Sequence, residues 1–171
     1  IGLSDGSLAF LGRGESKVGA FNPIMKGAVN ALYVAKLKEA TPEEPAVLKV
    51  VVAGTNGVIK VLDQELQPER EWNLYAKDYG LYTLGRVRGF KSVCCDKLNR
   101  KILYSTSAGE IGEIDFTTGD DVNAGPIVSG HFRDKLVAMV SHPLRQECIT
   151  AGEDKTLRVW DLETHNVIAL L

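Results

Sequence analysis

The sequence is poor in the residues that metal sites and most hydrolytic sites require. It holds three histidines and three cysteines among 171 residues, and Cys94, Cys95 and Cys148 follow no metal-ligand spacing. We interpret these cysteines as reduced thiols of an intracellular protein. We therefore expect neither a metal nor any other cofactor.

Long apolar runs and an excess of one charge are also missing. No stretch of about 18 apolar residues could form a membrane-spanning helix. The formal net charge is −2, without a basic block, whereas proteins that bind nucleic acid or anionic membranes usually carry a basic face. We expect neither nucleic acid nor a membrane as a partner.

One pattern is present four times: a polar turn followed by a strand with alternating apolar residues. The four copies span residues 2–11, 53–63, 105–115 and 150–161. Their turn residues, spaced by 51, 52 and 46 positions, are Gly6, Gly57, Gly109 and Lys155. A repeat of about 40 to 50 residues with one such hairpin in each unit is the signature of a β-propeller.

These repeats predict an all-β protein divided into propeller blades. We expect a partial blade of outer strands at 1–21 and complete four-stranded blades at 22–82, 83–129 and 130–171. Three and a half blades do not close a ring. The chain is therefore expected to be a fragment of a longer protein, a proteolysed product, or a half-ring completed by a second copy. Open blade edges predict self-association.

Three stretches make local predictions. The pair Asn22-Pro23 is expected to break the strand pattern, and residues 36–44 to form a solvated loop after a strand at 28–35. The nearly continuous apolar run at residues 47–53 predicts a strand that is buried on both faces.

The last unit begins with Gly130-His131 and its third strand ends with Trp160-Asp161. In these positions it resembles the WD-repeat family. The resemblance implies a hydrogen-bonded chain inside the blade, formed at the matching positions His131, Thr150, Asp154 and Trp160. The earlier units depart from the pattern: Leu62 and Ile114 stand where the tryptophan would be, and neither unit begins with Gly-His. We expect those units to depend more on apolar packing.

Further segments resemble the echinoderm microtubule-associated protein-like family, and together they cover most of residues 27–171. They lie at residues 89–93, 102–106 and 109–115, and at 130–131 followed by 135–143. This resemblance implies a non-catalytic scaffold of the cytoplasm and cytoskeleton, or of the cilium or flagellum, that binds tubulin or other cytoskeletal proteins. A separate coiled coil attaches members of that family to microtubules, and this sequence contains no heptad segment. The alternative is a WD-repeat adaptor in another intracellular complex, of the ciliary or ubiquitin-ligase type.

Sequences that look catalytic lack the required context. Residues 2–6 match the Gly-x-Ser-x-Gly elbow, but a strand and not a helix follows them. We predict that the protein is not an enzyme and has no catalytic residue. The candidate partner contacts are three basic residues and two tyrosines in or beside a connecting segment: Arg86, Arg88, Lys91, Tyr79 and Tyr82.

Overall fold

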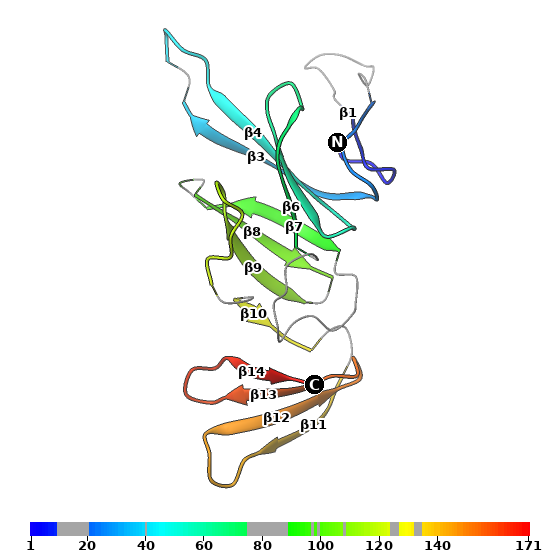
Figure 1. Ribbon diagram of the computed structural model, residues 1–171, viewed down its shortest axis with the longest axis vertical. Helices are drawn as coiled ribbons and strands as arrows, with labels where there is room; N and C mark the ends of the chain where they lie inside the picture. Colours follow the sequence, from blue (N-terminus) through cyan, green and yellow to red (C-terminus); the bar gives the residue numbers. More distant parts are fainter. Residues whose placement is uncertain are drawn as a thin grey trace.

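The computed structural model describes residues 1–9, 21–39, 41–74, 89–96, 98, 100–107, 109–123, 127–131 and 135–171. Within these ranges the regular elements are all β-strands, which form four separate antiparallel sheets (Figure 1). The predicted all-β class is confirmed. In the part of the chain that the structure describes, no helix could cross a membrane.

The first sheet has two strands, β1 (Ser7–Ala9) and β2 (Phe21–Pro23). The residues before β1 run along its other side, where Gly2 bridges to Leu8. The prediction that Asn22 and Pro23 break the strand pattern is wrong, because both belong to β2 and Pro23 pairs with Ser7. Proline lacks an N–H and is tolerated here because β2 is an edge strand. Within the partial blade expected at 1–21, the sequence predicts a second strand at residues 17–21, which lies outside the described residues except for Phe21.

The second sheet contains β3 (Val29–Lys38), β4 (Val47–Gly54), β5 (Val58–Leu62) and β6 (Pro68–Asn73), paired in that order. The loop predicted at residues 36–44 begins too early, because Lys36, Leu37 and Lys38 continue β3. Lysines can extend this exposed strand end because Lys36 pairs with Glu39 and Lys38 pairs with Glu44. The predicted burial of β4 on both faces holds only from Val51 onward.

The other two sheets also have four strands in chain order. The third contains β7 (Phe90–Cys95), β8 (Lys101–Thr106), β9 (Glu110–Asp115) and β10 (Val128–Ser129). The fourth contains β11 (Leu136–Ser141), β12 (Glu147–Gly152), β13 (Leu157–Asp161) and β14 (Val167–Leu170).

The main core lies between the second and third sheets. Its fully buried side chains include Val51, Ile59, Phe90, Ile102 and Ile114. Polar contacts join the same two sheets: Asn30 Nδ2 donates to Phe90 O (2.8 Å), Arg70 Nη1 to Phe116 O (2.8 Å), and Trp72 Nε1 to Thr118 O (3.1 Å).

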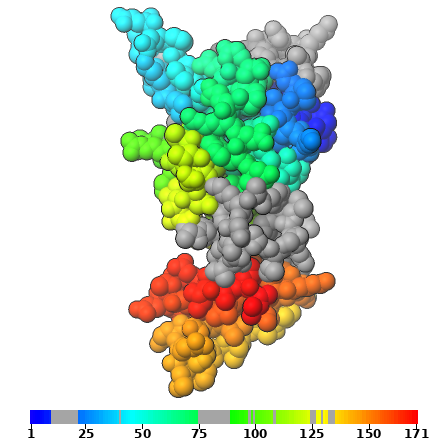
Figure 2. Space-filling model, in the orientation of Figure 1, coloured from blue at the N-terminus to red at the C-terminus, as the bar shows by residue number. Residues whose placement is uncertain are grey.

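A smaller cluster of Leu8, Met25, Val52 and Leu62 fills the space between the first and second sheets. The fourth sheet lies at one end of the molecule, where the space-filling view shows it as a separate mass (Figures 1 and 2). Buried apolar clusters thus join the first three sheets, whereas neither cluster includes a residue of the fourth sheet.

Candidate functional site

The four predicted turn residues all adopt the left-handed backbone conformation. Gly6, Gly57, Gly109 and Lys155 have φ angles of 87°, 71°, 72° and 63°. Glycine takes this conformation without a steric penalty, whereas a lysine there is strained. The recurring turn predicted from the sequence is therefore present in all four sheets.

In three of these turns an Asx side chain closes the loop. The Oδ1 atoms accept the amide two residues later, from Ser7 to Asp5 (2.9 Å), from Val58 to Asn56 (3.2 Å) and from Thr156 to Asp154 (3.1 Å). This local bond is the reason why Asp and Asn are favoured at the position. The turn of the fourth sheet differs from the other two, because the Asp154 carboxylate also bonds to His131, which lies outside the turn.

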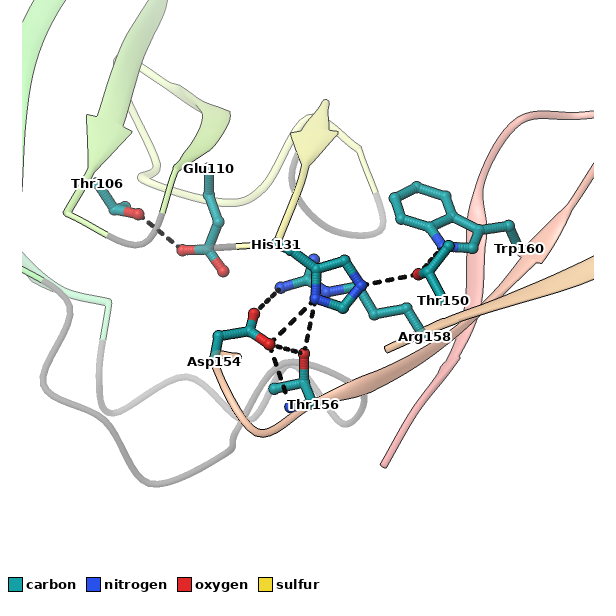
Figure 3. Close-up of polar contacts among 8 residues, drawn as sticks. All are labelled: Thr106, Glu110, His131, Thr150, Asp154, Thr156, Arg158 and Trp160. Carbon is teal, nitrogen blue, oxygen red and sulfur yellow. Dashed lines mark hydrogen bonds and ion pairs between the residues drawn. The ribbon is translucent and has the colours of Figure 1, made fainter. Parts of the chain in front are cut away.

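Figure 3 shows that the structure brings the four residues of the expected hydrogen-bonded chain together. Trp160 Nε1 donates to Thr150 Oγ1 at 2.7 Å. The same hydroxyl lies 2.7 Å from His131 Nε2, and His131 Nδ1 lies 3.0 Å from Asp154 Oδ1. These contacts connect β13, β12, the turn after β12 and the segment before β11 into one polar network.

The chemistry of the partners fixes the direction of each bond. An ionised carboxylate only accepts, so the proton of a neutral His131 belongs on Nδ1, where it is donated to Asp154. Nε2 is then an acceptor, and the Thr150 hydroxyl donates to it while accepting the indole N–H of Trp160. In this arrangement the Trp160 indole, the Thr150 hydroxyl and both ring nitrogens of His131 each have a hydrogen-bond partner.

The network is enclosed by the protein. Thr150 is 7% exposed and Asp154 is 4% exposed. Gly152 provides the necessary space, because a Cβ there would overlap His131 Nδ1 and Asp154 Oδ1. Burial makes each bond matter, since a polar group that loses its partner away from water costs free energy.

Two members of the network were missed in the sequence. Arg158 is buried, with Nη2 3.7 Å from Asp154 Oδ2, and Thr156 Oγ1 donates to Asp154 Oδ1 at 2.8 Å. The signal for Arg158 was available, because it lies two residues before Trp160 on β13 and therefore faces the same side of the sheet.

The third sheet has a different polar pair after its turn. Thr106 Oγ1 donates to Glu110 Oε2 at 2.8 Å, and Glu110 is 4% exposed. Glu110 directly follows the turn residue Gly109, as Thr156 follows Lys155. Figure 3 includes this pair in the same close-up as the His131 network.

Among the candidate partner contacts, only Lys91 falls in the described part of the chain, where it is exposed on β7. The other four, Arg86, Arg88, Tyr79 and Tyr82, lie outside the described residues.

A second recurring turn contains an aspartate whose carboxylate binds backbone amides. Asp115 Oδ1 accepts from Thr117 N (2.7 Å) and Thr118 N (2.8 Å). Asp161 Oδ1 likewise accepts from Glu163 N and Thr164 N, both at 2.8 Å. These amide bonds, with that to Thr118 or Thr164 largest, hold the pKa of each aspartate below its usual value of 3.8.

Among the described residues we examined the Cys95 thiol as a nucleophile and the His, Cys, Asp and Glu side chains as metal ligands. Burial, followed by the neighbouring Cys94 and Asp96, raises the pKa of Cys95 to about 12, so this thiol stays protonated near neutral pH. Within the described ranges, no group of three or more His, Cys, Asp or Glu side chains is placed to hold a metal ion.

The order of hydroxyl, imidazole and carboxylate in Thr150, His131 and Asp154 is that of a hydrolytic triad. Here, however, Thr150 is buried and its oxygen already accepts the Trp160 indole N–H. A nucleophile must reach a substrate, and this hydroxyl is bonded on both sides. The arrangement is suited to holding strands together.

Compared with models of known protein families, the sequence matches none.

Proposed function

We propose that this chain is part of a WD-repeat β-propeller and acts as a non-catalytic scaffold for other proteins. The observation that carries the proposal is the hydrogen-bonded chain Trp160–Thr150–His131–Asp154, with every bond between 2.7 and 3.0 Å. It uses the residues that the WD-repeat resemblance implies, and it lies beside one of the four left-handed turns that mark the repeat units.

A structural role for the network favours binding over catalysis. Its ionisable members are bonded to one another and to the turn, and both ring nitrogens of His131 have partners. Catalysis by these residues would require releasing at least one of those bonds toward a substrate. A scaffold requires only that the strands and turns stay in place.

We further propose, from the second resemblance, that soluble tubulin or another cytoskeletal protein is the partner, in the cytoplasm and cytoskeleton. The net charge of −2 disfavours strong nonspecific attraction to an acidic protein surface. A specific contact is therefore expected, whose affinity depends on shape and on a few anchor residues and not on bulk charge.

Sedimentation velocity of the purified chain, alone and with soluble tubulin, tests this partner. The expected result is movement of tubulin into a faster-sedimenting species. A chain with destabilised fourth-sheet packing, Asp154→Ala, serves as the comparison because it alters the network without changing the exposed surface of the other sheets.

If the folded wild-type chain leaves tubulin sedimentation unchanged, tubulin is not the partner of this part of the protein. The adaptor function would then be tested by identifying proteins that bind the wild-type chain and not Asp154→Ala. Turnover of ester, phosphoester or glycoside substrates by the wild-type chain would contradict the non-catalytic proposal.

A further inference from the structure

Two turns of the fourth sheet are each closed by the side chain of a residue at a strand end. Asp161, the last residue of β13, accepts on Oδ1 the backbone amides two and three residues later. His142 directly follows β11, and its Nδ1 accepts the amides of Leu144 (3.1 Å) and Arg145 (3.0 Å). A histidine ring and a carboxylate thus close two turns with the same hydrogen-bond pattern.

The two turns lie side by side at one end of the fourth sheet (Figure 1). They are joined through Leu162 N, which donates to Gln146 O at 2.8 Å. The bond from His142 N to Glu147 O, also 2.8 Å, continues the pairing of β11 with β12 into the turn. Opening of the turn at residues 142–147 is therefore expected to loosen the outer end of the sheet, beyond the turn itself.

The two closing groups respond differently to acid. A carboxylate accepts hydrogen bonds until it gains a proton at about pH 4, and the amides of Thr164 and Glu163 hold the pKa of Asp161 below its usual value of 3.8. An imidazole ordinarily gains its proton between about pH 5 and 8. Both nitrogens of the protonated ring are donors, so Nδ1 can then no longer accept an amide.

Around the His142 turn lie an arginine, two carboxylates and a thiol. Arg145 belongs to the turn, and its Nη2 lies 3.2 Å from Glu147 Oε2 on β12. Glu147 pairs with Asp161 on β13, and Cys148 pairs with Ser141. Imidazole is the only one of these side-chain types whose ordinary titration falls between about pH 5 and 8. A change of the turn in this range therefore points to the ring of the histidine.

We infer that His142 is a pH-sensitive switch of the fourth sheet, which holds the turn between β11 and β12 closed while its ring is neutral and releases it when Nδ1 gains a proton. The neutral ring carries its proton on Nε2, the reverse of His131, whose Nδ1 donates to Asp154. The bonds form only with the unprotonated nitrogen, so they stabilise the turn above the range of histidine titration and are lost as the pH falls through it. The switch is independent of the proposed scaffold function, because it depends only on the hydrogen bonds of this turn.

The test is amide hydrogen exchange of the full chain, followed by NMR between about pH 5 and 8. Protection factors, corrected for the intrinsic effect of pH on exchange, are compared for two pairs of amides. The protection of Leu144 and Arg145 is expected to fall about tenfold on acidification through this range, because two hydrogen bonds are lost. The amides of Glu163 and Thr164, bonded to Asp161 in the same sheet, are the internal control and should keep their protection.

Three variants assign the effect to its source. His142→Asn keeps a side-chain oxygen that can accept the same amides at any pH, so their protection is expected to stay high throughout. His142→Ala has no acceptor and should leave the protection low throughout. His165→Gln removes the histidine of the neighbouring turn and should retain the wild-type pH dependence. Near-ultraviolet circular dichroism checks that each variant is folded.

Nitrogen NMR of the His142 ring gives a second readout, and the neutral ring is expected to carry its proton on Nε2. Three results would overturn the proposal: wild-type protection of Leu144 and Arg145 that does not change with pH, the same pH dependence in wild type and His142→Asn, or a neutral ring protonated on Nδ1.

Discussion

The second and fourth sheets have an equivalent position beside the glycine that ends their second strand, and it is filled by an apolar side chain in one and a polar side chain in the other. In the fourth sheet, Gly152 makes room for His131 and Asp154; in the second, Gly54 makes room for the sulfur of Met25 and for Asn56. Met25 thus lies where the histidine would be.

The correspondence extends to the strands. Thr150 pairs with Arg158 in the fourth sheet, and Val52 pairs with Lys60 in the second. Leu62 stands at the place of Trp160, opposite Val50 as Trp160 is opposite Cys148. The apolar set Leu62, Val52 and Met25 packs with Leu8 of the first sheet.

The difference shows two ways to stabilise one strand arrangement. The apolar cluster depends on Leu8, which belongs to a neighbouring sheet, because an apolar side chain gains stability by removal from water. The polar network closes on itself within one sheet. This agrees with the environment of the fourth sheet, whose strand β11 has no buried side chain.

Loss of the shared carboxylate is expected to have the largest effect. Asp154→Ala removes the acceptor of His131 Nδ1, Thr156 N and Thr156 Oγ1 and the carboxylate that faces Arg158, so we expect destabilisation by about 2–4 kcal/mol. Asn56→Ala is the matched control: it removes the acceptor of one backbone amide, that of Val58, and is expected to cost about 1 kcal/mol. Urea unfolding measures both. Equal losses would mean that the network adds nothing to the turn.

Reciprocal substitutions should both destabilise the protein. Thr150→Val removes the hydroxyl between Trp160 and His131, and Val52→Thr introduces one into a fully buried apolar cluster. Each is expected to cost roughly 1–3 kcal/mol, because each leaves a buried polar group without a suitable partner. Thermal unfolding measures both variants, and an unchanged melting temperature in either one would contradict the proposed difference between the two sheets.

The turn residues allow a smaller test. Lys155 has a φ of 63° and should be relieved by Lys155→Gly, which we expect to stabilise the chain by about 0.5–1 kcal/mol. Gly109→Ala is the opposite change in the third sheet, where no neighbour lies within 4 Å of an added Cβ. It should destabilise by about 1 kcal/mol through the backbone alone. Chemical denaturation is the measurement, and changes of the same sign would contradict the account.

The smallest predicted effect depends on pH and should be the same in the third and fourth sheets. The pKa of Asp161 is lowered by the Thr164 and Glu163 amides, and that of Asp115 by the Thr118 and Thr117 amides. A carboxyl with a lowered pKa in the folded state stabilises above its unfolded pKa and loses this contribution as the pH falls below about 4.

Asp161→Asn and Asp115→Asn should therefore each flatten the acid limb of a stability–pH curve, and by similar small amounts. Thermal unfolding between pH 2 and 7, as a rough range for carboxyl titration, measures this. An acid limb as steep in both variants as in the wild-type chain would show that these carboxylates do not contribute.

The sequence was sufficient for the strand pattern wherever the local signal was strong. Alternation in the sequence predicts strands at residues 90–95, 136–141, 157–161 and 167–170, and β7, β11, β13 and β14 have these bounds. Turn residues and period-2 alternation are local, so they can be recognised without knowledge of the packing. The turn positions Gly6, Gly57, Gly109 and Lys155 are confirmed for the same reason.

What depended on packing was harder to predict. The extension of β3 through Lys38 depends on pairing with Val47 and on contacts to Glu44, and Pro23 is allowed in β2 only because that strand is an edge. The role of Met25 as the counterpart of His131 could not be found from the sequence, because no motif aligns an isolated methionine with a histidine. Arg158 was missed although its alternation with Trp160 pointed to the same face.

The most direct test of the network is the tautomer of the neutral His131 ring, measured by nitrogen NMR of histidine-labelled protein, with His131→Gln used for assignment. The account predicts that the neutral ring carries its proton on Nδ1, donated to Asp154, and that the unprotonated Nε2 accepts from Thr150. It also predicts slow exchange of the Trp160 indole proton, because that proton is bonded to Thr150 Oγ1. A proton found mainly on Nε2, or a ring that averages freely between its two tautomers, would contradict the account.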